Sequence, residues 1–210
     1  MQLILGSRRY SSWSLRGWLA VRLAALPVEE VVVPLADGVT SALLTYSPTG
    51  LVPVLNLGKI SVWDSLAIAE YCAEHAPALW PADRDSRAVA RAIAAEMHAG
   101  FAALRREFPM SLGRVPQEKT PSEAAAADIR RIVEVWQDCL GAGGGFLFGE
   151  APTIPDIMYA PVVTRFLTYQ VKLPPRAAEY CERIRNWDLM TLWYQLAAAE
   201  PESWRLAKYE

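Results

Sequence analysis

The sequence predicts an α/β domain over residues 1–77, followed by an all-α domain over residues 86–210. In the first third, short β-branched runs alternate with stretches of helical periodicity, whereas no credible strand pattern follows residue 86. The composition also changes after Pro77, where residues 78–85 have the character of a linker. The chain therefore combines one mixed domain with one helical domain.

The first domain begins with a strand at residues 2–5, which ends at Gly6. Apolar positions at helical spacing then predict a helix over residues 15–25. A β-branched run bounded by prolines predicts a second strand at residues 28–34, and residues 39–45 predict a short helix or turn.

A hairpin is expected next, with strands at residues 54–57 and 60–62, and a helix at residues 65–75 closes the domain. The resulting order is β-α-β-α-β-β-α. Because a crossover connection makes its first two strands parallel, this is the thioredoxin-like order.

The second domain should contain five helices, at residues 86–108, 121–140, 154–169, 175–186 and 188–199. A glycine-rich run at residues 141–145 interrupts the pattern. Thr153 and Asp156 have the spacing of a helix-capping box, with Pro155 in the first turn. Their role is structural, and Asp156→Ala is expected to lower stability by about 1 kcal/mol without changing ligand affinity.

Charge and composition exclude several classes of function. The 210 residues carry 21 basic and 23 acidic side chains without a like-charged block, which argues against nucleic-acid binding. The N-terminus turns polar by Ser7 and no apolar run reaches the roughly 18 residues of a membrane span, so we expect a cytoplasmic protein with no membrane partner. Three scattered cysteines without a C-x-x-C pair and only two histidines argue against a zinc site, a dithiol reductase or another metal centre.

Two short motifs predict a peptide-binding edge. Proline has no N–H for a sheet ladder, so Pro53 should open a strand, and a cis bond there would turn the backbone of Val52 outward. Val52 could then pair with an extended ligand. Asp64 and Ser65 add a carboxylate, a hydroxyl and helix-N-terminal amides nearby, a set of groups that suits a small zwitterionic peptide.

These motifs resemble those of the cytosolic glutathione transferases. The segment from Ser47 to Pro53 is similar to the family's N-P-x-x-x-V-P, and the segment from Trp63 to Tyr71 is similar to its acidic-S-x-A-I-x-x-Y. The capping box formed by Thr153 and Asp156 resembles a third motif of the family, and the three motifs follow one another in the same order as in the family. The resemblance implies the glutathione transferase fold, glutathione as cosubstrate held by Val52, Pro53, Asp64 and Ser65, and a homodimer.

The loop before the first helix resembles the serine-type classes, especially zeta. Residues 11–16 have the sequence S-S-W-S-L-R, similar to the zeta pattern S-S-x-S-x-R, which places Ser11 at the family's activating serine. A hydrogen-bond donor there stabilises thiolate over thiol and lowers a pKa of about 8.5. Ser12 and Tyr10 remain alternatives for contact with the sulfur, while Ser14 is expected to cap the helix.

The resemblance places the second substrate between the domains. Met97 and Phe101 belong to an apolar stripe whose default meaning is core, and His98 and Arg105 lie on its flank, where they could face a substrate or a dimer interface. An adaptable lining that includes Met110 suits a small hydrophobic electrophile.

The favoured function is therefore a glutathione transferase. A zeta-like isomerase of the maleylacetoacetate type is the first alternative, although its substrate-binding arginine is replaced by Thr168, with Arg165 one turn earlier, and its loop cysteine by Trp13. A non-enzymatic binding protein of the same fold is the second. Because the serine loop and the Asp-Ser pair are both present, an enzyme is favoured. The charge of Arg16 opposes the helix dipole, so helix propensity does not explain it. A buried salt bridge and a charge facing glutathione are both open, and the structural role is preferred.

Overall fold

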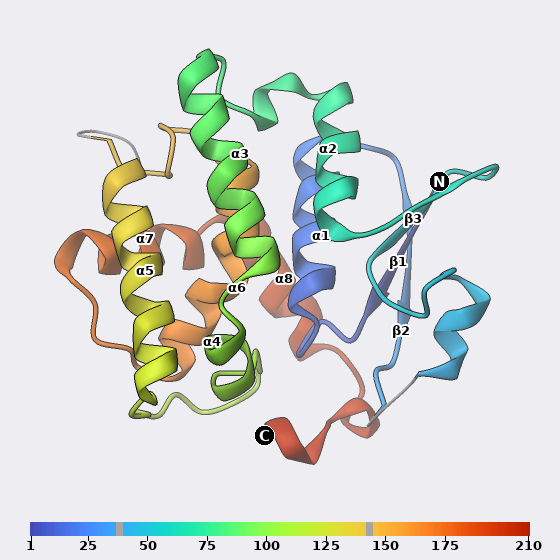
Figure 1. Cartoon of the computed structure of the whole chain (residues 1–210). Helices are drawn as coiled ribbons and strands as arrows, with labels where there is room; N and C mark the ends of the chain where they lie inside the picture. Colours follow the sequence, from blue (N-terminus) through green and yellow to red (C-terminus); the bar gives the residue numbers. More distant parts are fainter. Residues whose placement is uncertain (37–39, 142–144) are drawn as a thin grey trace.

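The computed structural model describes residues 1–36, 40–141 and 145–210. A mixed sheet with its own helices forms the first half, and a bundle of helices forms the second (Figure 1). The predicted turn at residues 39–45 and the glycine-rich break at residues 141–145 fall in part outside the described residues.

The sheet has four strands in the order β2-β1-β3-β4. Strand β1 (Gln2–Gly6) pairs parallel with β2 (Glu29–Val33) and antiparallel with β3 (Val54–Asn56), and β4 (Ser61–Val62) forms the edge beyond β3. The parallel first pair and the later hairpin confirm the predicted thioredoxin-like order.

Two helices cover the face of the sheet that turns toward the second half (Figure 1). These are α1 (Ser12–Leu23) and α2 (Ser65–His75), which lie side by side, and α1 also packs on α6 (Ile154–Thr168) of the helical half. Side chains of β1, β3, α1 and α6 consequently share one hydrophobic core. A smaller apolar cluster on β1, β2 and β3 includes Leu43 of the 3-10 helix η1 (Ser41–Thr45).

Further along the chain, the short 3-10 helix η2 (Pro77–Leu79) overlaps the beginning of the linker predicted at residues 78–85, and the next helix begins at Arg84, before the end of that linker. Helix α6 is buried along nearly its whole length and is packed on by several neighbours. The other helices of this half are α3 (Arg84–Ala99), α4 (Ala102–Glu107), α5 (Glu123–Cys139), α7 (Pro175–Arg185) and α8 (Asp188–Ala198), and the short 3-10 helices η3 (Glu202–Trp204) and η4 (Ala207–Tyr209) follow them.

The prediction of one continuous helix over residues 86–108 is wrong. The chain forms α3 and then α4, with a break at Gly100 and Phe101. Phe101 has φ +61°, a left-handed conformation that interrupts the helical hydrogen-bond ladder, and a side chain at residue 100 would meet the Glu96 carbonyl oxygen at 2.7 Å. Arg105 therefore lies on a different helix from His98. The apolar stripe itself is core, as predicted, because Met97, Phe101 and Leu104 are all buried.

Candidate functional site

The predicted peptide-binding residues line one cavity of about 620 Å³, here called the proline cavity. The Val52–Pro53 peptide bond is cis, and β3 begins at the next residue, Val54. Residues of both halves contribute to the walls of the proline cavity, which are formed by Trp13, Thr49, Leu51, Val52, Pro53, Trp63, Asp64, Ser65, His98 and Ala99.

Asp64 is held at the start of α2 from two sides. One carboxylate oxygen, Oδ1, accepts the amide of Leu66 at 3.0 Å, so Asp64 is the N-cap of α2. The other, Oδ2, lies 3.0 Å from His98 Nε2, and this contact links the α/β half to α3. The Ser65 hydroxyl is buried in the wall of the proline cavity and has no hydrogen-bond partner among the described residues. A ligand in this cavity would find a fixed carboxylate and an unengaged hydroxyl.

Ser11 is the N-cap of α1, which begins three residues earlier than predicted. Its hydroxyl accepts the Ser14 amide at 3.2 Å and donates to the Ser14 hydroxyl at 2.8 Å, while the Ser14 hydroxyl accepts the Gly6 amide at 2.9 Å. The cap is thus Ser11, and the expectation that Ser14 caps the helix is wrong. Because a hydroxyl proton rotates freely, Ser11 can turn its proton toward a ligand and still accept from the helix amide.

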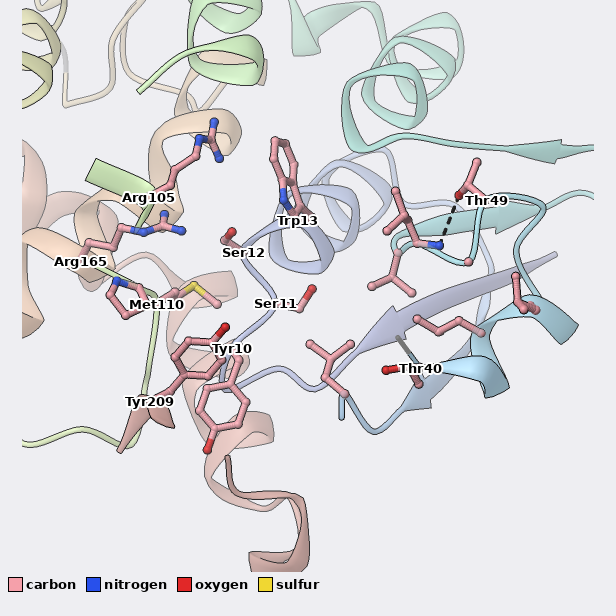
Figure 2. Close-up of a pocket in the computed structure, with 17 residues that line it drawn as sticks. Tyr10, Ser11, Ser12, Trp13, Thr40, Thr49, Arg105, Met110, Arg165 and Tyr209 are labelled. Atoms are coloured by element: carbon pink, nitrogen blue, oxygen red, sulfur yellow. Dashed lines mark hydrogen bonds between the residues drawn. The ribbon is translucent and has the colours of Figure 1, made fainter. Parts of the chain in front are cut away.

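Ser11 and Ser12 line a second cavity of about 540 Å³, here called the serine cavity. Figure 2 shows the two hydroxyls on different sides of the loop, Ser12 toward Arg165 and Ser11 toward Thr40 and Thr49. Four residues, Trp13, Thr49, Leu51 and Val52, line both cavities. The six residues predicted from sequence are therefore brought together around one pair of adjoining cavities.

Arg105 and Arg165 face the serine cavity from α4 and α6 (Figure 2). Arg165 is buried, and its Nη1 donates to the Pro161 carbonyl at 3.1 Å while Nε has no partner among the described residues. Neither guanidinium is in ion-pair contact with a carboxylate of the described chain. Burial, together with the charge of Arg105, lowers the pKa of Arg165 to about 9, and burial also lowers the pKa of Arg105. The Arg105 guanidinium also donates to the carbonyls of Gly100, at 2.9 Å, and Met97, and the charge of Asp128 partly opposes the lowering of its pKa. Both shifts indicate cations whose burial is not compensated by an ion pair.

Trp13 packs against two guanidinium groups. Arg16 lies 4.6 Å and Arg105 4.7 Å from the centre of the Trp13 ring system, and His98 contacts it edge-on at 5.3 Å. The ring quadrupole attracts both cations, which offsets part of the cost of their burial. Trp13 therefore links α1, α3 and α4 at the boundary of the two cavities.

Arg16 is fully buried and has a structural contact, as predicted. Its Nε donates to the Met158 carbonyl of α6 at 2.8 Å, which joins the two halves. Its two terminal nitrogens have no partner among the described residues. Burial, followed by the charges of Arg105 and Arg165, holds the pKa of Arg16 well below its usual range.

Tyr209, which sequence reasoning did not single out, also lines the serine cavity. It comes from the C-terminal segment and packs its ring 5.4 Å from that of Tyr10, a residue 199 positions earlier. The last ten residues lack helical or strand periodicity, so no sequence signal places them at the site.

The described residues offer no helix long and apolar enough to cross a membrane, and within the same ranges no group of three His, Cys, Asp or Glu side chains could hold a metal ion. The three cysteines are free, and none lines either cavity.

A thioredoxin-like half packed on a helical half, with cavities lined from both, is the architecture of the glutathione transferases. A glutathione S-transferase N-terminal domain model matches residues 10–75, and a glutathione S-transferase C-terminal domain model matches residues 120–187. Together these models cover more than half of the chain. The chain belongs to the glutathione S-transferase family.

Three similar proteins each share less than 30% sequence identity with this chain. The chain is 27% identical over 175 residues to the maleylacetoacetate isomerase of Rattus norvegicus, covering 80% of this chain and 79% of the relative. It is 26% identical to a maleyl pyruvate isomerase described as a bacterial zeta-class glutathione S-transferase, with a TM-score of 0.71 over 96% of this chain and 99% of the other. A glutathione transferase homolog from Burkholderia gl BGR1 with bound glutathione has a TM-score of 0.74 at 24% identity, covering 95% and 98%. These matches confirm the predicted fold class and the zeta-like resemblance.

Proposed function

We propose that this chain is a glutathione-dependent enzyme that directs the glutathione thiolate at an electrophilic carbon of an acceptor carrying a carboxylate. The proline cavity holds glutathione and the serine cavity holds the acceptor. Membership of the glutathione S-transferase family supports the first assignment. The observation that carries the second is the pair Arg105 and Arg165, two partly or fully buried cations without a carboxylate partner among the described residues, in the wall of the serine cavity.

In this proposal Val52 pairs through its backbone with the cysteinyl residue of glutathione, next to cis-Pro53, and Asp64 and Ser65 hold the γ-glutamyl end. The unpartnered Ser65 hydroxyl suits a carboxylate, while Asp64 suits an ammonium group. The glutathione sulfur would then lie near the boundary of the cavities, on the side of Ser11.

Ser11 stabilises the thiolate by donating its hydroxyl proton, and the N-terminus of α1 adds a favourable dipole. Ser12 lies on the side of Arg165 and is better placed to touch the acceptor (Figure 2). An acceptor carboxylate would offset part of the positive charge of Arg105 and Arg165, which favours a hydrophobic electrophile with an anionic end over a wholly apolar one.

Isomerisation is a second candidate function. Two of the similar proteins are described as isomerases, and Arg165 lines the serine cavity, where it could bind a carboxylate of such a substrate. The thiolate would add to the β-carbon of a cis double bond that is conjugated to a carbonyl, so that a C–S bond forms, the C=C π bond breaks and its electron pair moves into the carbonyl to give an enolate. Rotation about the resulting single bond and expulsion of the thiolate would return glutathione unchanged. A transferase consumes one glutathione per turnover, whereas an isomerase consumes none.

The test uses Ser11→Ala and Ser12→Ala as a matched pair. We expect Ser11→Ala to raise the pKa of bound glutathione, measured by the ultraviolet absorbance of the thiolate, and to lower turnover about 10- to 100-fold, the value of one hydrogen bond to a charged group. Ser12→Ala should leave that pKa unchanged. Ser11→Thr, which keeps both hydroxyl and cap, controls for folding. Loss of the thiolate only in Ser12→Ala would transfer the role to Ser12.

The acceptor class is tested with wild-type protein and two panels, apolar aryl halides and cis-alkenes with one or two carboxylates. Glutathione consumption is followed beside product formation. Faster turnover of the carboxylated panel is expected, and Arg165→Gln should remove that preference. Equal rates on both panels, unaffected by Arg165→Gln, would contradict the carboxylate assignment.

A further inference from the structure

The C-terminal segment, residues 200–210, returns from the end of α8 to the loop that precedes α1 (Figure 1). The Glu200 carboxylate accepts the backbone amides of Arg8 at 2.6 Å and Arg9 at 3.3 Å. The Arg9 side chain in turn donates to the carbonyls of Ala197, Glu200 and Pro201. The beginning of the segment is thus bound to the loop by both backbone and side-chain hydrogen bonds.

The end of the segment is fastened by Tyr10. The Tyr10 hydroxyl accepts the Leu206 amide at 3.0 Å and donates to the Glu210 side-chain carboxylate. Arg205 Nη1 also contacts that carboxylate, at 3.1 Å. Burial and the hydrogen bond to Glu210 raise the pKa of Tyr10, so its phenol stays protonated at neutral pH. Its single proton is directed to Glu210 and is not offered to a ligand in the serine cavity.

The hydrogen bonds that Tyr10 makes with Leu206 and Glu210 position the neighbouring residue Tyr209. The Tyr209 ring packs on Tyr10 and lines the serine cavity, near Met110 and below Arg165 in the view of Figure 2. Neither Tyr10 nor Tyr209 lines the proline cavity. A change in the position of the segment would therefore alter the part of the serine cavity that Tyr10 and Tyr209 form, which lies outside the proline cavity.

We propose that Tyr10 is a positioning residue that holds residues 205–210 against the loop before α1, and that Tyr209, so placed, determines which acceptor substituents the serine cavity admits. This inference rests on the proposed function, in which the serine cavity holds the acceptor. It assigns Tyr10 a role other than contact with the sulfur, the alternative that the sequence left open.

Two readouts that need no turnover test the proposal. The rate of hydrogen exchange at the Leu206 amide reports whether its hydrogen bond to the Tyr10 hydroxyl is intact. Tyr10→Phe should increase this rate about tenfold, which is the effect of losing one hydrogen bond. Calorimetry measures the affinities for S-methylglutathione and S-hexylglutathione. Because the S-substituent extends from the sulfur into the place proposed for the acceptor, the ratio of the two affinities reports the space available in the serine cavity. Tyr209→Ala removes a ring from the wall of the serine cavity and should shift the affinity ratio about tenfold in favour of the hexyl compound. A change of this size is what one or two methylene groups contribute to binding in an apolar pocket.

Matched variants separate the two steps. Tyr209→Phe keeps the ring and should behave as wild type in both readouts, whereas Tyr209→Ala should keep the protection of the Leu206 amide. Tyr10→Phe should change both the exchange and the affinity ratio, with unchanged affinity for glutathione and an unchanged pKa of its bound thiol.

Three outcomes would overturn the proposal: unaltered Leu206 exchange in Tyr10→Phe, an unaltered affinity ratio in Tyr209→Ala, or a raised thiol pKa in Tyr10→Phe, which would make Tyr10 the sulfur's donor. Failure of wild-type protein to bind glutathione would instead contradict the proposed function. Exchange at Leu206 would still decide whether Tyr10 fastens the segment.

Discussion

Asp156 is a single residue on which three segments converge. It is fully buried at the start of α6, where it accepts the amides of Leu147 at 3.0 Å and Thr153 at 2.8 Å and the hydroxyls of Thr153 and Tyr180, both at 3.0 Å. Burial raises its pKa, and the four hydrogen bonds oppose that rise. The capping box predicted from sequence is present, but the carboxylate also fixes the turn before α6 and the helix α7.

Asp156→Ala should therefore lower the free energy of unfolding by about 3–5 kcal/mol, because it leaves several buried donors without an acceptor. This exceeds the 1 kcal/mol expected for a helix cap alone. Tyr180→Phe removes one of the four donors and should cost about 1 kcal/mol. Urea unfolding of both variants checks the values, and equal losses in the two would contradict the account. Glutathione affinity of folded Asp156→Ala should match wild type.

How much of the site the sequence predicts depends on whether its residues carry a local signal. Pro53, Asp64 and Ser11 stand at the start of a strand or helix, where backbone geometry restricts the residue type, so short motifs locate them. The contact between Asp64 and His98 and the approach of Tyr209 to Tyr10 depend on packing between distant segments. Spacing in the sequence carries no information about such pairs.

At the scale of elements, α1 positions the loop that contains Pro53. Gly17 of α1 lies against this loop, and a Cβ atom at residue 17 would come within 2.7 Å of Pro53 Cγ and 2.9 Å of its Cβ. Both distances are shorter than van der Waals contact. The close approach of helix and loop thus requires glycine at this position, although glycine is a poor helix former.

Gly17→Ala should displace Pro53 and Val52 and weaken glutathione binding about tenfold, with lower stability despite the gain of about 1 kcal/mol in helix propensity. Calorimetric titration with glutathione and urea unfolding measure the two effects. Gly141→Ala is the matched control, because a Cβ there meets nothing within 4 Å. Tighter or unchanged glutathione binding in Gly17→Ala would show that the loop does not depend on this contact.

Elements with strong periodicity are predicted closely, and the missed break in the helix predicted over residues 86–108 has a physical cause. The apolar stripe from Ile93 to Phe108 continues across Gly100 with helical spacing, because α4 resumes the same buried face after the break. Periodicity reports which side of a segment is buried. It does not report a single left-handed residue such as Phe101, which changes the direction of the chain.

At the scale of the whole molecule, one core joins the two halves. Buried side chains of β1, α1, α2 and the helices α3 to α8 belong to a single hydrophobic cluster. Polar contacts cross the same boundary, from Arg16 to the Met158 carbonyl and from His98 to Asp64. The halves are expected to unfold together, since neither can separate without exposing part of the shared core.

The three cysteines provide probes of this cooperativity. Burial raises the pKa of Cys72 to about 12, of Cys139 to about 11 and of Cys181 to about 12. Cys72 lies on α2, and the other two lie on α5 and α7. At pH 8 the native thiols are almost wholly protonated, and those of Cys72 and Cys181 are also buried, whereas unfolded thiols, with a pKa near 8.5, ionise substantially.

Labelling with a disulfide reagent at pH 8 should accordingly be slow for native protein, and all three thiols should become reactive over one narrow range of urea concentration. Because the folded-state pKa values lie above the unfolded ones, the thiols favour folding below about pH 8 and this contribution is lost as pH rises toward 11–12. The midpoint of the urea transition should fall over that range. The matched control is a Cys72→Ser, Cys139→Ser, Cys181→Ser protein, whose midpoint should fall less. Labelling of Cys72 at a distinctly lower urea concentration than Cys181 would show that the α/β half unfolds on its own.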